Sequence, residues 1–587
     1  MLRKLLIAVS LALVLAPAAA AQRVTLMPGV TYERGVQFTP HGPVALHIVT
    51  GPRPTGLYAL RPVLSNEAIQ GRERVTAMQR RLSSTATMVG VNGDLFHWET
   101  GRPSGVLMRD GVVESPPYGD RSSVGITADG ALDVRRVEFF GTWRGLGQRR
   151  AVNDMNEPPD VNGVSLFTPS YGPATPPLPG TVAVVLAPFP PALPNTDLYG
   201  AVVAVANGAG TAIPRNGAVL VARGTAAQRL TAEAPIGSEL TLRVILRPDW
   251  TGITQGIGGG PVLVRNRGPV FRSYEAFSPS QLVPRNPRTA IGQLANGRVI
   301  LVATDGRQPG YSVGMTNFEL AQTMARLGSV TASALDAGGS TTLAFEGTLL
   351  NRPSDPGGER PVSTSLQLMY YGVFVPPAVP VVSPNGDGVD ETQRLSYKVV
   401  APSAVTATLT APDGTQPFVE TLERTPGTYA IPFPPTEPLA EGRWQLDVSA
   451  TDDQGRASTA RQSFSVNNTL GDVKLSRKAF VARARGRQFV QAGVTLTRPA
   501  RLTVTVETRT GGVRIATIAA ARAEKGRYLV QWNGTTRGGR AFVYGGDYVL
   551  RFRAVNELGV AELVSKPVRV TVIRSAPKKP KKTTPSG

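Results

Sequence analysis

The strand-like runs of this chain end repeatedly in polar, glycine-containing turns, and the pattern is densest between residues 286 and 347. Apolar or β-branched runs at residues 298–304 and 330–335 have the composition of buried strands. Asp305 and Asp336 directly follow these runs, with a glycine one or two residues further on. Such an Asp presents a carboxylate at the rim of a pocket. If the two strands are neighbours in a sheet, the two carboxylates meet at one site.

A helix is predicted between these two runs. Thr316 is a good N-cap residue, and Glu319 three positions later completes a capping-box pattern. Apolar side chains then recur at helical spacing until a glycine closes the segment, at Leu320, Met324, Leu327 and Gly328.

The rest of the chain up to residue 375 reads as short strands joined by tight turns. Asp-Gly pairs at 110–111 and 129–130 lie between β-prone runs and predict hairpins. Residues 67–82 are a weak helix candidate. We therefore expect residues 22–375 to form an α+β domain of mostly short strands with few helices.

The composition shifts at the two prolines 376–377, and two blocks of alternating strands and turns follow. The blocks cover residues 383–470 and 472–574, each the size of an immunoglobulin-like sandwich, and lack helical periodicity. We expect two all-β immunoglobulin-like sandwiches. The basic tail, residues 575–587, is rich in Lys, Pro, Ser and Thr and is expected to be disordered.

The first 21 residues have the pattern of a secretory signal peptide. Arg3 and Lys4 precede an apolar run at residues 5–15, and three alanines at 19–21 suit a cleavage site. An uncleaved anchor is the alternative, although the run is shorter than the ~20 residues that span a bilayer. We expect a bacterial protein that is periplasmic, cell-envelope-associated or secreted, with no integral membrane span after cleavage.

Composition narrows the chemistry. The chain has no cysteine, which excludes disulfides, thiolate nucleophiles and Cys-based metal sites. It has only three histidines and no Gly-x-Ser-x-Gly elbow, which disfavours a protease or lipase. The net charge of +21 reflects many arginines and suits either simple solubility or an anionic partner. No nucleic-acid motif accompanies that charge, so nucleic acid is not expected as a partner.

Residue types near the two Asp turns suit the hydrolysis of a glycosidic bond. Asp305 and Asp336 are candidates for a carboxylate pair, in which one group handles the leaving oxygen and the other activates water or attacks carbon. Arg288 and Arg307 can hold a phosphate by their fork geometry. The turn at residues 338–340 can offer backbone N–H groups and a hydroxyl to the same anion. On spacing alone, however, an Asp-Gly pair is most often only a turn.

Two further polar turns have either a functional or a purely structural role. Asn92-Gly93-Asp94 follows another strand-like run and is also a strong turn signal. Residues 385–391 cluster oxygen ligands in a glycine-rich turn, as calcium loops do, but lack the full EF-hand pattern. A structural calcium held by Asn385, Asp387 and Asp390 is one interpretation, and an acidic linker turn is the other. The sequence requires no other cofactor.

Five motifs in order resemble the phosphodiester glycosidase family over roughly residues 40–375. They lie at residues 92–96, 286–292, 305–314, 335–342, and 351–354 together with 358–362. The resemblance implies hydrolysis of a sugar-1-phosphodiester to free sugar and a phosphomonoester. The C-terminal blocks resemble bacterial immunoglobulin-like modules, the second of them the Ig-like domain of flagellar hook-cap proteins, which implies a spacer or assembly role.

The chain departs from the family pattern at three positions. Asp94 and Leu95 stand where the family usually has Gly and Phe, and Ala337 stands where it usually has Gly. Alanine is costly at 337 only if that residue needs a positive φ.

The resulting candidate site has two groups of residues. The candidate catalytic carboxylates are Asp336, Asp305 and Asp94, with the individual roles open. The candidate substrate- and phosphate-binding residues are Asn92, Arg288, Arg307, Gly338, Gly339, Ser340, Thr341, Arg352, Glu359 and Arg360.

The leading functional hypothesis is an exported hydrolase that cleaves a sugar-1-phosphodiester in an envelope or extracellular glycan, so an anionic glycan or sugar phosphate is the expected partner. The alternative is a non-catalytic glycan-binding or envelope scaffold protein on a degenerate glycosidase domain. The sugar, its anomeric configuration and the oligomeric state are left open by the sequence.

Overall fold

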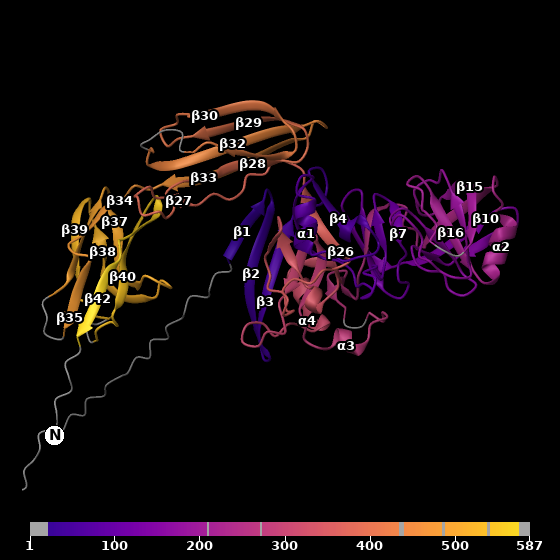
Figure 1. The fold of residues 1–587 in the computed structure, drawn as a ribbon, viewed down its shortest axis with the longest axis horizontal. Helices are drawn as coiled ribbons and strands as arrows, with labels where there is room; N and C mark the ends of the chain where they lie inside the picture. Colours follow the sequence, from indigo (N-terminus) through magenta and orange to yellow (C-terminus); the bar gives the residue numbers. More distant parts are fainter. Residues whose placement is uncertain are drawn as a thin grey trace, which may run out of the picture. The chain divides into compact units, whose positions relative to one another are not determined.

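The computed structural model describes residues 22–207, 210–270, 273–433, 439–483, 488–536 and 541–573. The chain divides into two compact units, Met1–Tyr371 and Gly372–Gly587 (Figure 1). The signal-peptide pattern and the basic tail lie outside the described residues. No helix within the described part is long and apolar enough to cross a membrane.

The protein is mostly β, with 52% of its residues in strands and 7% in helices. The α+β assignment of the first unit is therefore wrong. Its helices are few and short, and they fill gaps beside sheets instead of forming a layer of their own: α1 (Val75–Arg81), α2 (Thr225–Glu233), α3 (Pro279–Leu282) and α4 (Asn317–Arg326), with 3₁₀ turns η1 (Ser65–Glu67) and η2 (Gly338–Ser340). Alternating apolar side chains elsewhere favour half-buried strands over helices.

The sheet that carries the candidate site has eight strands, in the order β1-β2-β3-β22-β21-β23-β19-β20. The predicted strands at 298–304 and 330–335 are confirmed as β22 and β23. The bounds of all eight are β1 (Gln22–Met27), β2 (Val30–Thr39), β3 (Gly42–Gly51), β22 (Val299–Thr304), β21 (Arg288–Leu294), β23 (Ser329–Ala334), β19 (Val262–Arg265) and β20 (Gly268–Pro269).

Helix α4 forms as its capping box predicts. The Thr316 hydroxyl accepts the Glu319 N–H at 3.1 Å, and the Glu319 carboxylate accepts the Thr316 N–H at 2.9 Å. Its apolar side chains Leu320 and Met324 are fully buried with those of β22 and β23 in one core. The helix thus crosses over one face of the sheet and carries the chain from the end of β22 to the opposite end of the sheet, where β23 begins.

A five-stranded sheet, β25-β24-β5-β26-β4, brings the Asn92 motif next to this edge. Every residue of β5 and β26 is buried, because both faces are covered. The bounds are β25 (Thr348–Leu349), β24 (Leu343–Phe345), β5 (Thr87–Asn92), β26 (Thr364–Tyr370) and β4 (Tyr58–Leu64).

A second five-stranded sheet, β7-β6-β18-β8-β9, contains both predicted Asp-Gly hairpins. At the first of these turns Asp110 and Gly111 both have positive φ, 50° and 81°, as a type I′ turn requires. The bounds are β7 (Val112–Ser115), β6 (Leu107–Arg109), β18 (Ile253–Gly258), β8 (Ser122–Thr127) and β9 (Leu132–Arg136).

The remaining sheet of the first unit has eight strands and a large apolar core around Trp143 and Trp250. Helix α2 packs beside it (Figure 1). In sheet order, the bounds are β11 (Arg150–Val152), β10 (Glu138–Arg144), β17 (Glu239–Arg247), β15 (Asp197–Asn207), β14 (Thr181–Leu186), β16 (Ala218–Arg223), β13 (Val164–Phe167) and β12 (Asp154–Met155).

The second unit is all-β, and its first block, up to residue 466, pairs a five-stranded with a two-stranded sheet. Buried residues of both sheets, such as Tyr397 and Leu446, share one core. The bounds are β27 (Val381–Val382), β33 (Ala457–Val466), β32 (Gly442–Asp452), β29 (Ser403–Thr410) and β30 (Phe418–Arg424), with β28 (Leu395–Val399) and β31 (Gly427–Ile431).

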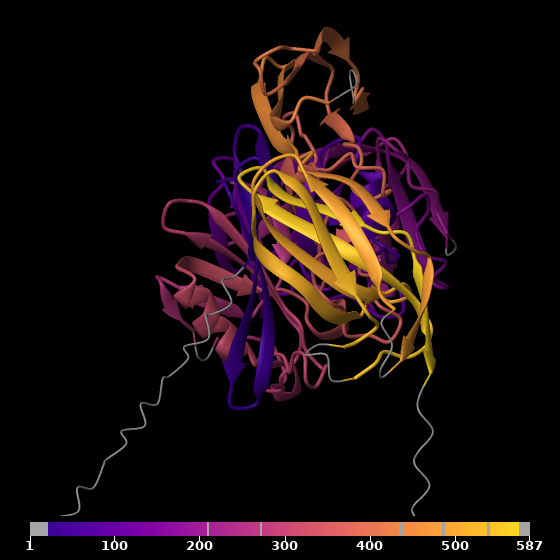
Figure 2. The same cartoon turned by 90° about the vertical axis from the view of Figure 1, so that its left-hand side faces the viewer.

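The second block pairs a three-stranded with a six-stranded sheet around Trp532 and Phe552. Figure 2 shows its yellow and orange strands face-on, as twisted layers. The immunoglobulin-like assignment of both blocks stays a prediction. The bounds are β34 (Leu470–Leu475), β36 (Val490–Leu496), β39 (Gly526–Trp532), β35 (Ala479–Arg483), β42 (Val568–Ile573), β40 (Gly546–Asn556), β37 (Ala500–Thr508), β38 (Arg514–Ala523) and β41 (Gly559–Val564).

The acidic turn at residues 385–391 is used as a connector within the second unit. The Asp387 carboxylate accepts the N–H groups of Val389 and Val564, both at 2.8 Å, and Asn385 Nδ2 donates to the Glu562 carbonyl at 2.6 Å. Among the described residues, no three His, Cys, Asp or Glu side chains are grouped so as to hold a metal. The turn thus fastens the first block to β41, and structural calcium at Asn385, Asp387 and Asp390 stays an untested prediction.

Candidate active site and anion pocket

The ends of three central strands lie side by side at one end of the first eight-stranded sheet. β22 and β23 both run antiparallel to β21, which lies between them, so they run parallel to each other. Asp305 and Asp336 follow the carboxyl ends of β22 and β23, and therefore lie at the end of the sheet where β21 begins with Arg288. The assumption that β22 and β23 are neighbours is wrong. Their backbones are two strand spacings apart, roughly 10 Å, which separates the two carboxylates.

Asn92, the last residue of β5, connects that strand to the residues at this end of the eight-stranded sheet. Its side chain is completely buried, and its Oδ1 accepts the Thr289 hydroxyl at 2.7 Å and the Thr342 N–H at 3.1 Å. Its Nδ2 donates to the Asp336 carbonyl at 2.8 Å, and the Asp336 N–H donates to the Gly93 carbonyl at 3.0 Å. All of its hydrogen bonds hold other motifs of the site together. These contacts make Asn92 a positioning residue, and its predicted role in substrate binding stays a prediction.

A pocket of about 190 Å³ lies beside these strand ends, and four of the sequence-predicted residues line it: Arg288, Arg307, Asp336 and Gly338. An apolar cavity of about 150 Å³ takes up one benzene, so this pocket has room for one six-membered ring or one phosphate group. Its lining residues are Leu95, Gly260, Pro261, Phe277, Ser280, Gln281, Asn286, Arg288, Arg307, Asn317, Ala334, Leu335, Asp336, Ala337 and Gly338.

Arg288 is a buried cation without a carboxylate partner among the described residues. Its guanidinium donates to four backbone carbonyls, those of Met315 (3.0 Å), Gln281 (2.8 Å), Leu282 (3.3 Å) and Pro284 (2.8 Å). Burial, together with the nearby charge of Arg307, lowers the Arg288 pKa to about 10. These carbonyls use four of the five guanidinium N–H groups, so Arg288 offers a bound anion its positive charge and one remaining N–H.

Arg307 brings a second positive charge to the same pocket. Its Nε donates to Asn286 Oδ1 at 2.9 Å, and within the described ranges it too has no carboxylate partner. An added Cβ at Gly338 would lie 2.9 Å from Arg307 Nη2, so a larger residue there would push this guanidinium aside. Gly338 has a φ of +67°, and this backbone conformation favours glycine. Two adjacent guanidiniums that form no ion pair among the described residues make the pocket suited to an anion.

Among the residues that the structure describes, Asp336 is the one carboxylate that lines this pocket. Its Oδ1 accepts the Ala337 N–H at 2.8 Å. Desolvation by burial raises the Asp336 pKa, although a hydrogen bond from Ser340, the Ala337 N–H and the charges of Arg360 and Arg121 oppose that shift. A carboxylate with a raised pKa is a stronger base once it is ionised, which suits it to take a proton from water.

Asp94 lies behind Asp336 and not in the pocket. Its carboxylate is 3% exposed and accepts the N–H groups of Leu95 (2.8 Å) and Gly105 (2.7 Å). Burial raises its pKa to about 7 against those two hydrogen bonds, and the neighbouring charge of Asp336 raises it further. The structure thus couples two carboxylates electrostatically, and they are Asp94 and Asp336, not Asp305 and Asp336.

This raised pKa predicts a pH-dependent stability that Asp94→Asn should remove. Between pH 4 and 7 the folded state keeps a proton that the unfolded state has lost, so stability falls as pH rises through that window. The shift from 3.8 to about 7 corresponds to about 4 kcal/mol, at about 1.4 kcal/mol per unit. Asp94→Asn also loses one acceptor, but that cost is independent of pH.

The measurement is the free energy of unfolding in urea of the wild type and of Asp94→Asn, at pH 4.5 and at pH 8. The unfolding transition to follow is the one that the substitution shifts. The stability advantage of the wild type should shrink by up to about 4 kcal/mol between these pH values. A difference that is the same at both pH values would show that Asp94 titrates normally.

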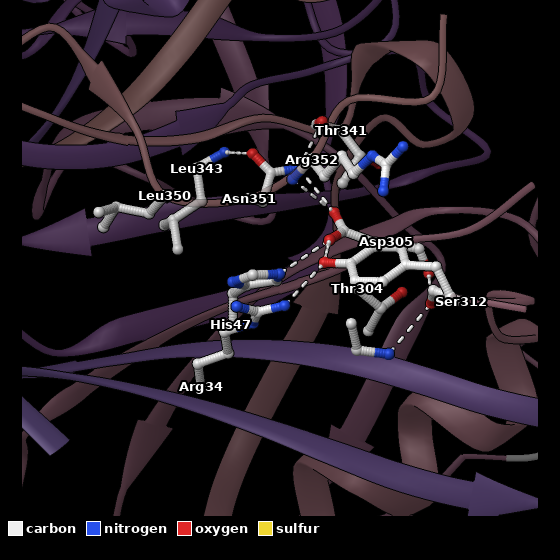
Figure 3. Close-up of polar contacts among 12 residues, drawn as sticks. Arg34, His47, Thr304, Asp305, Ser312, Thr341, Leu343, Leu350, Asn351 and Arg352 are labelled. Atoms are coloured by element: carbon white, nitrogen blue, oxygen red, sulfur yellow. Dashed lines mark hydrogen bonds and ion pairs between the residues drawn. The ribbon is translucent and has the colours of Figure 1, made fainter. Parts of the chain in front are cut away.

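Asp305 is the centre of a buried hydrogen-bond network and does not line the pocket. Its side chain is 0% exposed and accepts four hydrogen bonds, from His47 Nε2 (2.9 Å), Tyr311 Oη (2.8 Å), Asn351 Nδ2 (3.1 Å) and the Arg352 N–H (3.0 Å). Figure 3 shows His47, Asn351 and Arg352 around its carboxylate. Four donors thus surround its carboxylate, which fixes the turn that carries Arg307, and the predicted catalytic role of Asp305 stays a prediction.

The other sequence-predicted residues lie around the pocket. Ser340 and Thr341 are buried in the η2 turn, and the Gly339 Cβ position is blocked, 2.0 Å from Arg360 Nη2. Arg360 pairs with both oxygens of Asp355 and its Nη1 lies 3.5 Å from Ser340 Oγ.

Two predicted binding residues instead have structural contacts. The Glu359 carboxylate accepts the N–H and hydroxyl of Thr76 in the first turn of α1, at 2.9 and 2.6 Å. The Arg352 guanidinium stacks over the ring of Tyr311, 5.0 Å from its centroid.

Ala337, a departure from the family pattern, has a φ of −127° and an extended backbone. Alanine is therefore unstrained there, and the positive φ of this turn falls on Gly338. Sequence reasoning missed Asn286, Asn317 and Gln281 as pocket residues. Asn286 belongs to the sequence motif at residues 286–292, which is a signal that could identify it, whereas Gln281 and Asn317 lie on helices that the sequence does not link to the site.

Comparisons with known proteins agree with the central motifs. A family model described as phosphodiester glycosidase matches residues 196–369, which include Arg288, Arg307 and Asp336. The SPbeta prophage-derived uncharacterized protein YomE of Bacillus subtilis (strain 168) is 33% identical over 119 residues, covering 20% of this chain and 18% of that protein. The chain thus spans less than a fifth of the length of this relative.

Three solved structures are similar to the chain. A hypothetical protein from Synechocystis has a TM-score of 0.51 at 24% identity, covering 60% of this chain and 64% of that one. A putative exported protein from Burkholderia pseudomallei K96243 has a TM-score of 0.46 at 25% identity (56% and 74% covered). The catalytic domain of zebrafish N-acetylglucosamine-1-phosphodiester alpha-N-acetylglucosaminidase has a TM-score of 0.33 at 16% identity (59% and 87% covered). The family match over residues 196–369 supports a glycosidase-type function for this chain.

Proposed function

We propose that the protein is an exported hydrolase that cleaves a sugar-1-phosphodiester in an envelope or extracellular glycan. Water adds to C1 of the sugar, the bond from C1 to the phosphate oxygen breaks, and the products are free sugar and a phosphomonoester. The observation that carries the proposal is the pairing of two uncompensated guanidiniums, Arg288 and Arg307, with one carboxylate, Asp336, in a single small pocket.

The leaving group explains why one carboxylate suffices. A phosphomonoester has a second pKa of about 6, so it departs as an anion at neutral pH without being protonated by the enzyme. Most glycosidases need a general acid for an alkoxide leaving group, but here arginines can stabilise the departing negative charge instead. The position of Asp305 outside the pocket is compatible with this mechanism.

Asp336 is assigned to the carbon side of the reaction, as the base that activates water or as the nucleophile that attacks C1. Only its ionised form can do either, so kcat/KM should rise as the pH increases through its raised pKa. The charge of Asp336 raises the pKa of its neighbour Asp94. Asp94 is assigned a positioning role, because its carboxylate accepts hydrogen bonds from the N–H groups of Leu95 and Gly105.

The direct test is a screen of the full-length protein against methyl diesters of hexose-1-phosphates and N-acetylhexosamine-1-phosphates in both anomeric forms. Free reducing sugar and methyl phosphate should appear in equal amounts. Binding of a diester without turnover over long incubation would favour the non-catalytic glycan-binding alternative. The unstrained alanine at position 337 removes one reason to regard the domain as degenerate.

Arg307→Ala should weaken phosphate recognition without unfolding the protein. A charge-assisted hydrogen bond to a phosphate contributes about 1.5–3 kcal/mol, so kcat/KM and inhibition by inorganic phosphate should both weaken by about 10- to 100-fold. Arg307→Lys should recover part of the loss, because the charge remains but the fork geometry does not. Arg514→Ala, at an exposed position in the second unit, is the control. Unchanged phosphate inhibition in Arg307→Ala would remove Arg307 from the anion site.

The export part of the proposal rests on residues 1–21 of the sequence. Fractionation of cells that express the full chain should place the mature protein, beginning near Gln22, outside the cytoplasm. Recovery of the full-length chain from the cytoplasm would contradict it.

A further inference from the structure

A second, larger pocket adjoins the anion pocket and differs from it in chemistry. It has a volume of about 530 Å³, and Pro261 and Asn317 line both pockets. Half of its other lining residues are aliphatic, including Leu263, Val270 and Leu282, and Tyr274 and Phe318 add aromatic surface. The two pockets together therefore offer a charged compartment and an apolar compartment side by side.

The one carboxylate in this apolar pocket is already occupied. Glu275 accepts the Val262 N–H at 2.8 Å and the Ser122 hydroxyl at 3.0 Å through one oxygen, and the Ser122 N–H at 2.8 Å through the other. Arginine and lysine are absent from the lining residues that the structure describes. An anionic group would therefore lose hydration there without gaining a cationic partner among the described lining residues.

At the rim of this pocket, large apolar side chains face water. Val283 is 66% exposed and Tyr274 is 80% exposed. Covering such side chains with an apolar ligand removes their surface from water, which favours binding. At roughly one benzene per 150 Å³, the pocket admits an apolar group on the order of ten to twenty carbon atoms.

Asn317 marks the junction of the two pockets. It is 8% exposed, and its Oδ1 has no hydrogen-bond partner among the described residues. A buried amide oxygen without a partner is costly, so a donor from a bound ligand is expected at this point. At the junction, Asn317 Oδ1 can thus accept one hydrogen bond from a ligand whose anionic part lies in one pocket and whose apolar part lies in the other.

We propose that the alcohol on the far side of the phosphodiester is a lipid-type alcohol, with its alkyl or prenyl chain seated in the apolar pocket and its phosphate held by Arg288 and Arg307. This inference rests on the proposed function. Hydrolysis then joins the water oxygen to C1, breaks the bond from C1 to the phosphate oxygen, and transfers the water proton to the departing phosphate or to solvent. The products are free sugar and a lipid monophosphate.

The test compares two diesters of the same sugar-1-phosphate that differ only in the alcohol, methyl or octyl, with octyl used below its critical micelle concentration. The octyl diester should have a KM at least tenfold lower. Val283→Asp should abolish this preference and leave turnover of the methyl diester unchanged, since Val283 is exposed and outside the anion pocket. Val513→Asp, equally exposed in the second unit, should behave as wild type. Equal KM values for the two diesters would overturn the inference while leaving the proposed function intact.

A binding measurement separates the two proposals if neither diester is cleaved. Octyl phosphate and methyl phosphate are titrated into the full-length protein by calorimetry. Octyl phosphate binding at least tenfold more tightly, with the advantage lost in Val283→Asp, would support the apolar pocket even though hydrolysis had failed. Equal affinities would overturn the inference, as would an octyl preference that Val283→Asp retains, which would indicate a second copy or another surface as the binding partner.

Discussion

Asp336→Asn should reduce kcat/KM for a sugar-1-phosphodiester by about a thousandfold or more and leave the Tm within about 2 °C of the wild-type value. Asparagine can neither take a proton from water nor attack C1. Its Oδ1 can still accept the Ala337 N–H, so the turn keeps its shape. Since burial already disfavours the charge on Asp336, removing that charge should not destabilise the fold.

The control for this variant is Asp129→Asn, in an Asp-Gly turn of the same unit. Asp129 has a side chain that is 70% exposed and lies outside the pocket lining. Its activity should equal that of wild type. Full activity in Asp336→Asn would remove Asp336 from the reaction, and a large drop in Tm would mean that its role is structural.

Asp305→Asn should have the opposite effect, a large loss of stability with a modest effect on chemistry. The carboxylate accepts four hydrogen bonds in a fully buried position, and an asparagine would present an NH₂ group to two of the four donors. Leaving buried donors unpaired predicts a loss of about 3–5 kcal/mol. The Tm should fall on the order of 10 °C, measured by calorimetry.

The decisive quantity for Asp305 is turnover per folded molecule, measured well below the lowered Tm. We expect kcat to stay within about tenfold of wild type, because the group acts through the Arg307 turn and does not touch substrate. If Asp305→Asn had the Tm of the wild type but no turnover, Asp305 would have the catalytic role that the sequence suggests.

The features that the sequence predicted correctly are local ones. The capping box of Thr316 and Glu319 formed as expected, and so did the hairpin turn at Asp110. These features depend on residues within one or two turns of each other, so the information that specifies them is present in a short window. The α+β assignment failed because helices as short as α1 and α3 contribute little beside the strands.

The sequence identified residues that lie in or around the pocket, but not which of the two aspartates lines it. Asp305 and Asp336 both follow a buried strand, and nothing in their immediate sequence distinguishes them. One carboxylate is enclosed by donors from β3 and from the loop at residues 351–352, and the other is left at a pocket. Those donors lie up to 258 residues away in the chain, so a reading of local patterns could not include them.

The sequence by itself determined which segments become strands, where α4 begins, and that acids and arginines cluster in turns, because backbone sterics, side-chain periodicity and capping act over short distances. Tertiary structure decided the insertion of β21 between β22 and β23, the burial of Arg288 among four carbonyls and the partnership of Asp94 with Asp336. Strand order depends on which non-local surfaces exclude the most water, and a carboxylate's pKa depends on the desolvation and charges around it; both are fixed only once the chain has packed.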